Sequence, residues 1–302
     1  MNRRTFLQRL ALLGAAGWLA RTPGFAQTAA SQSSTGLFIP LRRNVGFFTG
    51  RGGTIGWLVN PDALVVVDTQ FPETAVQCRD GLPGRDGRVI DVVFNTHHHR
   101  DHTSGNGVFK ETAKSIVAHA NVPRLQRVGV ENPAAVVVAD ETFEKSWRRD
   151  LGDETVTATY FGPAHTSGDV IVHFEKANVV HMGDLVFNRV YPVIDRPSGA
   201  SIRHWITVLE TAAKIYPADA IYIFGHGNER FGIQGTQADL LVFRDYLSGL
   251  LAYVSRQISA GESRANLIAL ENLPGFSDFH QPLPNRLGLN LGVAYDELTA
   301  KG

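Results

Sequence analysis

The sequence predicts an α/β fold in one large domain, and three features of the chain support this. Its 302 residues are 43% apolar and 19% charged, which allows a sizeable core. Short apolar runs bounded by turn residues recur as far as residue 224, as buried strands do. Amphipathic stretches of helical spacing appear after residue 201, and several apolar runs end in histidine or aspartate. We therefore expect a polar site at the ends of strands.

The first half of the chain is expected to alternate strands with short helices. Turn residues at 50–53 and 60–62 separate the first three strands. The stretch 134–145 is ambiguous, because its valines favour a strand and its acidic residues favour a turn. We expect strands at 45–48, 54–59, 63–67, 89–94 and 115–118, and helices at 74–80 and 122–130.

The second half is expected to add further strands and the longer helices. Apolar residues recur at helical spacing from Ile202 to Ala213, and Pro217 ends that helix. The leucines of residues 240–251 make the next helix amphipathic. We expect strands at 155–161, 170–174, 179–181 and 221–224, and helices at 202–216, 238–259, 266–273 and 289–298.

A histidine-rich motif follows the apolar run at 89–94 directly. Alternate side chains of an extended segment point the same way, so His97 and His99 can converge while His98 faces elsewhere. Imidazoles at a strand end suit a borderline-soft cation such as zinc. A nonspecific metal-binding histidine tract is the alternative. The preceding strand and the following glycines favour a built metal site.

The same motif continues with an aspartate and a fourth histidine. Asp101 and His102 follow the expected turn of the chain, so they can reach a second point close to the first. Thr103 and Ser104 are residues that cap helices well, and we expect a helix to start there.

Three later stretches each place one ligand-type residue beside a glycine at a strand end. His165 ends the sequence Gly-Pro-Ala-His, Asp184 follows Gly183, and His226 is flanked by glycines. Glycine lets the backbone approach a metal closely. Each of the three taken alone would be an ordinary loop residue. Together with the first cluster, and in this order, they indicate one site.

These motifs resemble those of the metallo-β-lactamase-fold hydrolases, over residues 44–228. Five motifs occur in order: an aspartate after an early strand (Asp68), His-x-His-x-Asp-His, Gly-Pro-Ala-His, Gly-Asp and Gly-His-Gly. The resemblance implies a four-layer αβ/βα sandwich of two similar halves. It also implies a metal-dependent hydrolase with two zinc ions, although iron or manganese could be the native metal.

The resemblance assigns a role to each motif residue. Asp68 would orient ligands without binding metal. Asp101 would also be catalytic, because it would hold and orient a hydroxide generated between cations about 3.5–4 Å apart. The implied ligands are His97, His99 and His165 for the first metal, and Asp101, His102 and His226 for the second, with Asp184 bridging both.

Departures from the best-known β-lactamase branch bear on the substrate. That branch has a cysteine ligand where this chain has Asp184, and the single cysteine, Cys78, lies outside the motifs as an expected core residue. The aspartate favours the thioester hydrolase and lactonase branches, so we expect cleavage of an ester, thioester or lactone-type bond. His99 stands where the di-iron flavoproteins have glutamate, which favours zinc hydrolysis over oxygen or nitric oxide reduction.

Candidate substrate contacts follow Asp184 along the chain. Arg189 could pair with a substrate carboxylate, and a solvated loop arginine is an equal alternative. Early-hairpin aromatic residues could cover the substrate, although core packing is favoured for Trp57. The candidates after Asp184 are Phe187, Asn188, Arg189 and Tyr191; those in the hairpin are Phe47, Phe48 and Trp57; those of second rank are Asn228, Glu229 and Arg230.

The N-terminus resembles a twin-arginine export signal. Arg3 and Arg4 precede Phe-Leu, a weakly apolar run covers residues 10–20, and a small-x-small end closes at Ala26. An amphipathic helix or a membrane anchor is the alternative, but the run is too short to span a bilayer, so no stable anchor is expected. We expect recognition by the twin-arginine machinery, cleavage near Ala26 and a periplasmic location. The expected parts are a signal peptide (1–26), a flexible leader (27–36) and a hydrolase domain (37–302).

Charge and composition limit the partners. The 29 basic and 29 acidic residues balance, so no nucleic-acid footprint is expected and the partner is a small-molecule substrate. Three alternatives stay open: a metallo-β-lactamase acting on β-lactams, a phosphodiesterase, and a metal-binding protein without catalysis.

Replacing both Arg3 and Arg4 by lysine should leave the precursor in the cytoplasm, because the export receptor reads both guanidinium groups. The measurement is the share of the protein in the periplasmic fraction, with Arg9→Lys as the matched control. A double variant exported at the wild-type level would contradict the export signal.

Overall fold

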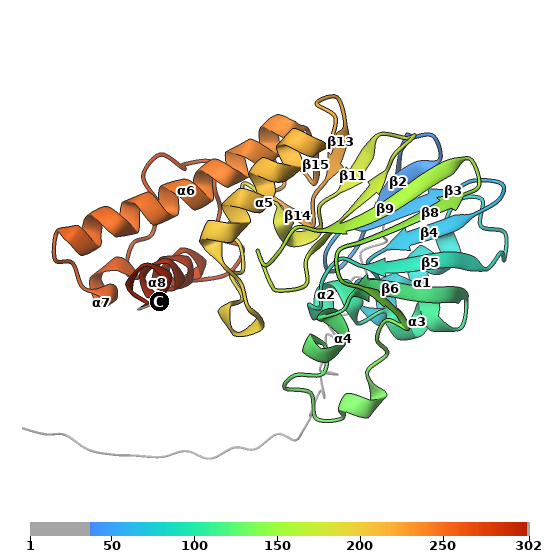
Figure 1. Ribbon diagram of the computed structural model, residues 1–302, viewed down its shortest axis with the longest axis horizontal. Coiled ribbons are helices and arrows are strands. Elements are labelled where there is room, and N and C mark those ends of the chain that lie inside the picture. The colour runs from blue at the N-terminus through green and yellow to red at the C-terminus, as the bar shows by residue number, and fades with distance from the viewer. Residues whose placement is uncertain (1–36, 301–302) are drawn as a thin grey trace, which may run out of the picture. The chain divides into compact units, whose positions relative to one another are not determined.

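The computed structural model describes residues 37–300, and its first sheet contains seven strands in chain order (Figure 1). The strands are antiparallel from the first to the fourth and parallel from the fourth to the seventh. They are β1 (Leu37–Arg42), β2 (Val45–Thr49), β3 (Ile55–Val59), β4 (Leu64–Val67), β5 (Ile90–Asn95), β6 (Ala113–His119) and β7 (Glu141–Phe143).

The second sheet contains six strands in the order β15-β13-β11-β10-β9-β8. Its only parallel pair is β11 with β13, and a separate two-stranded parallel ribbon joins β12 (Phe187–Asn188) to β14 (His226–Gly227). The six strands are β8 (Ser146–Leu151), β9 (Glu154–Tyr160), β10 (Val170–Phe174), β11 (Val179–His181), β13 (Ile221–Ile223) and β15 (Gln234–Gly235).

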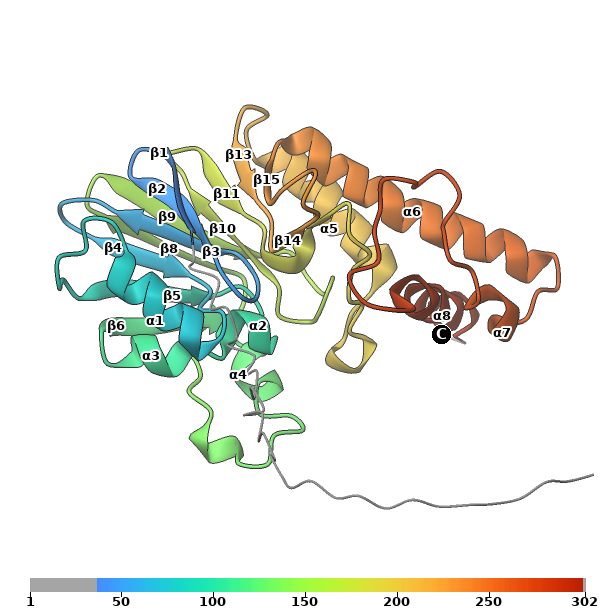
Figure 2. The same ribbon diagram turned by 180° about the vertical axis from the view of Figure 1, so that it is seen from behind.

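Helices cover the outer faces of both sheets (Figures 1 and 2). On the first sheet these are α1 (Pro72–Gly81) and α3 (Asn106–Lys110), and on the second α5 (Ile202–Ile215) and α6 (Gln237–Ser259), with α8 (Arg286–Thr299) packed in the same core. Short elements fill the connections: α2 (Arg100–Thr103), α4 (Val122–Leu125), α7 (Arg264–Leu267) and the 3₁₀ turns η1 (Pro133–Ala135), η2 (Gly183–Leu185) and η3 (Arg196–Ser198).

The alternation of β4 side chains shows how the layers are built. Leu64 and Val66 pack against α1 and α3, whereas Val65 and Val67 pack into the core between the two sheets. Both faces are buried, which explains why this strand is an unbroken apolar run. Cys78 of α1 is fully buried in the helix-side core, as expected. The four-layer αβ/βα sandwich is confirmed.

Three expected helices are absent or shorter than expected. No helix starts at Thr103 or Ser104: the short helix α2 ends there, and α3 begins after Gly105. The Thr103 hydroxyl donates instead to the carbonyls of His98 and His99 within the preceding turn. The expected helix 122–130 is only the single turn α4, and the expected helix 266–273 is replaced by the turn α7.

Strands β1 and β8 were not predicted, and both are edge strands. Edge strands carry prolines and charges that discourage further pairing. In β1 the apolar run is broken by Pro40, which lies at a register shift, whereas β8 contains Arg148, Arg149 and Asp150. Neither segment is therefore an unbroken apolar run.

The N-terminal predictions lie outside the described residues. The signal peptide (1–26) and leader (27–36) therefore stay predictions. Within residues 37–300, no helix has both the length and the apolar character needed to cross a bilayer.

The topology directs the ligand-type residues to one edge of the sandwich. Strands β4 and β5 are parallel neighbours, so their carboxyl ends place Asp68 beside the 97–102 segment. Strands β11 and β13 are parallel too, and the segments that follow them carry Asp184 and His226. Each half of the sandwich thus supplies part of one site.

Candidate metal centre

The structure brings together all seven side chains that the sequence predicts as metal ligands. They form two groups, and within each group the possible ligand atoms lie within 4.8 Å of one another. The first group contains His97, His99, His165 and Asp184, and the second contains Asp101, His102 and His226.

Asp184 lies between the two groups, as a bridging ligand would. Its Oδ2 is 3.5 Å from His165 Nε2 and 3.4 Å from His226 Nε2, and its Oδ1 is 3.0 Å from His102 Nε2. The side chain is 3% exposed. Gly225 allows this position, because a Cβ atom there would lie 2.0 Å from Asp184 Oδ1.

A chain of hydrogen bonds from Asp68 orients His97. The Thr96 hydroxyl donates to Asp68 Oδ2 at 2.8 Å, so its oxygen accepts from His97 Nδ1 at 3.1 Å. The Nε2 atom of His97 therefore carries a lone pair. This atom is buried and has no hydrogen-bond partner among residues 37–300. A buried, unpaired acceptor is costly unless something absent from the bare polypeptide satisfies it.

Asp68 also fixes the second histidine group directly. His102 Nδ1 donates to Asp68 Oδ2 at 2.7 Å, which leaves His102 Nε2 facing Asp184 and Asp101. Asp68 is fully buried, as predicted for a carboxylate that orients ligands. Its backbone has a φ of +67°, a left-handed conformation that is strained for a residue other than glycine.

In His165 and His99, the ring nitrogens that are free to accept a hydrogen bond point towards each other. His165 Nδ1 donates to the carbonyl of Val193 at 2.8 Å, and His99 Nε2 donates to Asp195 Oδ2 at 3.0 Å. The remaining nitrogens, His165 Nε2 and His99 Nδ1, are 2.9 Å apart. Two lone pairs at this distance repel unless a cation lies against both. The donor set therefore fits a metal ion.

Burial and neighbouring histidines keep two imidazoles of the first group, those of His97 and His165, neutral. Burial, and then the charge of His102, holds the pKa of His97 well below its ordinary value. Burial and the neighbouring His99 lower the pKa of His165 to about 3. Metal ligation requires neutral imidazole, so these side chains are available as ligands at neutral pH.

The second group is dominated by the carboxylates. Burial alone would lower the pKa of His226. The nearby carboxylates of Asp184 and Asp101 outweigh this effect and raise the pKa of His226 to about 9. In return the charge of His102 and the hydrogen bond from His226 overcome burial and lower the pKa of Asp101 to about 2. This end of the site concentrates negative charge, which a divalent cation would neutralise.

Asp195 is a site residue that the sequence analysis missed. Its carboxylate contacts His99, and its Oδ2 also lies 3.4 Å from His98 Nε2, so one side chain holds two adjacent histidines. Its backbone N–H donates to the carbonyl of His165. Asp195 lies on a loop outside every recognised motif, and an aspartate near a proline was the only available signal.

The structure gives three of the proposed substrate residues other partners. Arg189 is bound to Asp239 at 2.5 Å and stacks over Phe231, so its charge is already paired. Asn188 is buried and donates to the carbonyls of Phe231 and Gly232. Tyr191 is buried against Tyr246 and Phe279.

Phe187 is the member of this segment that does reach the site. Its ring stacks on His226 with the centroids 5.3 Å apart and lies against His165. The hairpin aromatics Phe47, Phe48 and Trp57 are core residues, so they do not cover the site. Asn228 is buried, whereas Glu229 and Arg230 line a cavity of about 740 Å³ that begins at Gly227, directly after His226.

A family model described as the metallo-beta-lactamase superfamily matches residues 48–226, which contain the whole cluster. The chain belongs to the metallo-β-lactamase superfamily. This superfamily's fold is also found in a solved metallo-beta-lactamase from Pontibacter korlensis, with a TM-score of 0.61 and 16% identity over 70% of this chain and 99% of that one.

Curated relatives of this superfamily protein include two kinds of hydrolase. It is 28% identical to a hydroxyacylglutathione hydrolase of Crocosphaera subtropica over 42% of this chain and 44% of that protein, and 32% identical to one of Brucella ovis over 46% and 50%. It is also 22% identical to the metallo-beta-lactamase IND-1 of Chryseobacterium indologenes, over 58% and 72%. The matches span about half the length of the hydroxyacylglutathione hydrolases. The family and these names indicate a hydrolase.

Protein purified without chelators should contain close to two metal ions per chain, chiefly zinc. His97→Ala removes an acceptor that only a cation satisfies, so it should lose at least one ion. His173→Ala is the matched control, because His173 lies on β10 and belongs to no group of possible metal ligands among residues 37–300, and it should keep two. Metal analysis that finds one ion or none in the zinc-reconstituted wild type would rule out the dinuclear centre.

Proposed function

We propose that this superfamily member is a dinuclear zinc hydrolase that cleaves an ester, thioester or lactone-type bond. The observation that carries the proposal is that the inner nitrogens of His97, His102 and His165 surround a buried carboxylate, Asp184, while the outer nitrogens of His97, His99, His102 and His165 are tied to fixed acceptors. The ions would be held by the seven predicted ligands. When bound, such ions polarise a carbonyl group and lower the pKa of a water to about 7.

Asp101 has the position of a group that orients the attacking water. Its side chain is 31% exposed, against 3% for Asp184, so it is the carboxylate that solvent and substrate can reach. Its Oδ2 lies 3.1 Å from His226 Nε2, and its own carbonyl accepts from the N–H of Gly53. The lowered pKa keeps this carboxylate ionised, so it accepts a hydrogen bond from water rather than donating one.

Nucleophilic catalysis by a side chain has no support near the site. Ser104 caps the C-terminal end of α2, and the Ser167 side chain packs against Gly199. Cys78 is fully buried under the first sheet, where burial raises its pKa far above the ordinary value. An activated water is therefore the nucleophile that the chain can best supply.

The remainder of the substrate is proposed to lie in the cavity beside His226. That cavity continues from Gly227 past Glu229 and Arg230 to His280. Its volume of about 740 Å³ is within the usual range for small-molecule sites. Export to the periplasm remains part of the proposal and rests on the N-terminal sequence alone.

The choice of bond rests on Asp184. If two cations are bound, Asp184 would add negative charge next to them and would make the metal a poorer acceptor for an anionic lactam nitrogen. Thiolate and alkoxide leaving groups need that stabilisation less. The names of the hydroxyacylglutathione hydrolase relatives support this choice. The β-lactam alternative is supported by the similarity to IND-1.

Asp101→Asn should lower kcat by at least about 10²-fold, the lower range for groups of this kind. The amide keeps the shape but loses the charge that orients water and contributes to ligation. The matched control is Asp86→Asn, an exposed loop aspartate with φ of +47°, a conformation that asparagine tolerates. Steady-state kinetics with metal analysis decides; a near-normal kcat in Asp101→Asn would mean that its role is misassigned.

Wild-type protein should hydrolyse an activated thioester, ester or lactone with a higher kcat/KM than a chromogenic cephalosporin. Asp184→Cys and Asp184→Ser should shift that ratio towards the cephalosporin, provided that metal analysis shows both sites filled. A wild-type preference for the cephalosporin of about tenfold, equivalent to about 1.4 kcal/mol in the barrier, would overturn this order and favour the β-lactamase alternative.

A further inference from the structure

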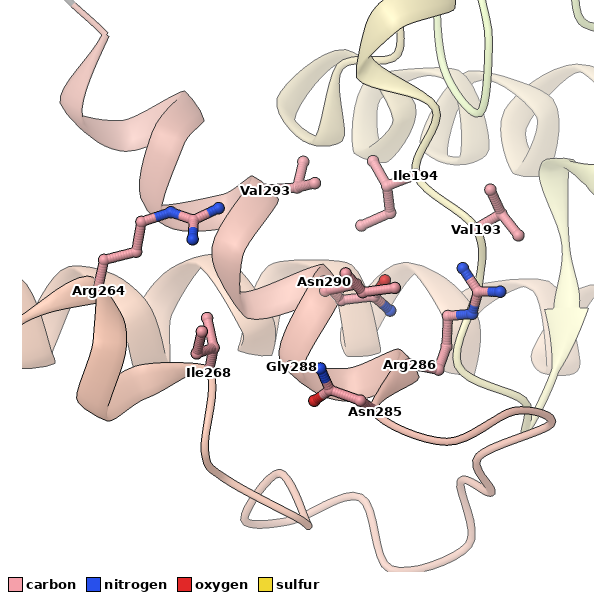
Figure 3. A pocket seen from close by; sticks show the side chains of 10 residues that line it. Val193, Ile194, Arg264, Ile268, Asn285, Arg286, Gly288, Asn290 and Val293 are labelled. Carbon is pink, nitrogen blue, oxygen red and sulfur yellow. The ribbon is translucent and has the colours of Figure 1, made fainter.

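A second cavity, distinct from the metal centre, lies between α8, α7 and the 193–194 segment (Figure 3). Its volume is about 240 Å³, and none of the seven predicted ligands lines it. In Figure 3 the side chains of Val293 and Ile194 lie along one side, and the guanidinium group of Arg286 points towards Val193. Ile268 lies on the opposite side, beneath Val293.

The cavity has one positive charge without an acidic partner among residues 37–300, that of Arg286. Its lining contains two arginines and no aspartate or glutamate. Arg264 is neutralised by a two-pronged ion pair with Asp296, with N···O distances of 2.9 Å. Arg286 has no acidic partner within residues 37–300, and its Nε atom is buried without a hydrogen-bond partner. The side chain is only partly buried, but its buried Nε lacks the hydrogen bond that it would make in water, and an anion in the cavity would supply one.

The size and the walls of the cavity limit the anion. A volume of about 240 Å³ is below the usual range for drug-sized ligands. The lining includes the aliphatic side chains of Val193, Ile194, Ile268 and Val293 as well as Asn285 and Asn290, so the cavity offers apolar contact as well as charge. We propose that this cavity binds a small carboxylate with a short apolar chain, its carboxylate on Arg286 and its chain against Val293, Ile268 and Ile194. A planar carboxylate matches the fork of a guanidinium group.

The occupant would contact the segment that holds two of the predicted metal ligands. Val193 lines the cavity, and its carbonyl oxygen accepts a hydrogen bond from His165 Nδ1 at 2.8 Å. Asp195, two residues later, accepts from His99. The cavity and the metal centre thus share one short stretch of backbone, so a ligand in the cavity is placed to influence the metal ligands without touching them.

The test is isothermal titration of the metal-loaded wild-type protein with sodium butyrate at constant ionic strength. Butyramide, with the same chain and no charge, tests the need for the anion, and inorganic phosphate tests the need for the chain. Arg286→Gln removes the charge, Arg286→Lys keeps it, and Val293→Phe fills the cavity. Arg203→Gln, an exposed arginine on α5, is the matched control. Metal content and thermal unfolding are measured for each variant.

We expect saturable butyrate binding to wild type, to Arg203→Gln and to Arg286→Lys. Binding should weaken by about tenfold or more in Arg286→Gln and in Val293→Phe, and for butyramide and phosphate on wild type. Butyrate that bound at the metal centre would ignore both cavity substitutions, and that result would overturn the proposal. So would the lack of saturable binding to wild type, or equal affinity for butyramide or phosphate. If Arg286→Gln fails to fold, Val293→Phe and the two comparison ligands still decide.

Discussion

The carboxylate of Asp68 is the group on which the geometry of the site depends. It accepts from the backbone and hydroxyl of Thr96 and from His102 Nδ1, and through Thr96 it also sets the ring of His97. One buried side chain therefore fixes a histidine in each of the two ligand groups. Because both rings are held from outside, their inner nitrogens point into the same small volume, and that of His97 has no hydrogen-bond partner among residues 37–300. That arrangement is unfavourable in a bare polypeptide and favourable around cations.

The fold supplies the rest of this arrangement by bringing two sheets to one edge. Parallel strand pairs, β4 with β5 and β11 with β13, end beside each other, so loops far apart in sequence meet. The cores on both sides of each sheet consist of buried aliphatic and aromatic side chains, which keep those strand ends in place. The close approach of Gly225 to Asp184 depends on this registry, since even a methyl group would displace the carboxylate. The rigid layers thus hold the histidine and aspartate side chains of the site close together.

Most of the fold, and the clustering of the seven side chains proposed as metal ligands, could be predicted because their signals are local. A buried strand that ends in His97 or a glycine beside His226 is visible in a few consecutive residues. Asp195 could not be predicted, because its role comes from a loop that folds back over the histidines. Tyr191 and Arg189 were misjudged for the same reason: proximity to Asp184 in sequence does not decide whether a side chain faces the site or the core beneath α6. The edge strands were missed because charges in β8 and Pro40 in β1 break their apolar runs, as is typical of strands that must avoid further pairing.

The left-handed backbone of Asp68 has a consequence for protein engineering. Glycine would adopt a φ of +67° without strain, but replacing Asp68 by glycine would leave the buried Thr96 N–H and His102 Nδ1 without their acceptor, which costs more than the strain that it relieves. The same substitution would remove the acceptor that holds His97 and His102. Gln70, two residues further along the loop, shares this left-handed conformation with a φ of +54°. Stabilising libraries for this scaffold should therefore exclude the loop after β4 and draw instead on exposed positions far from the metal edge.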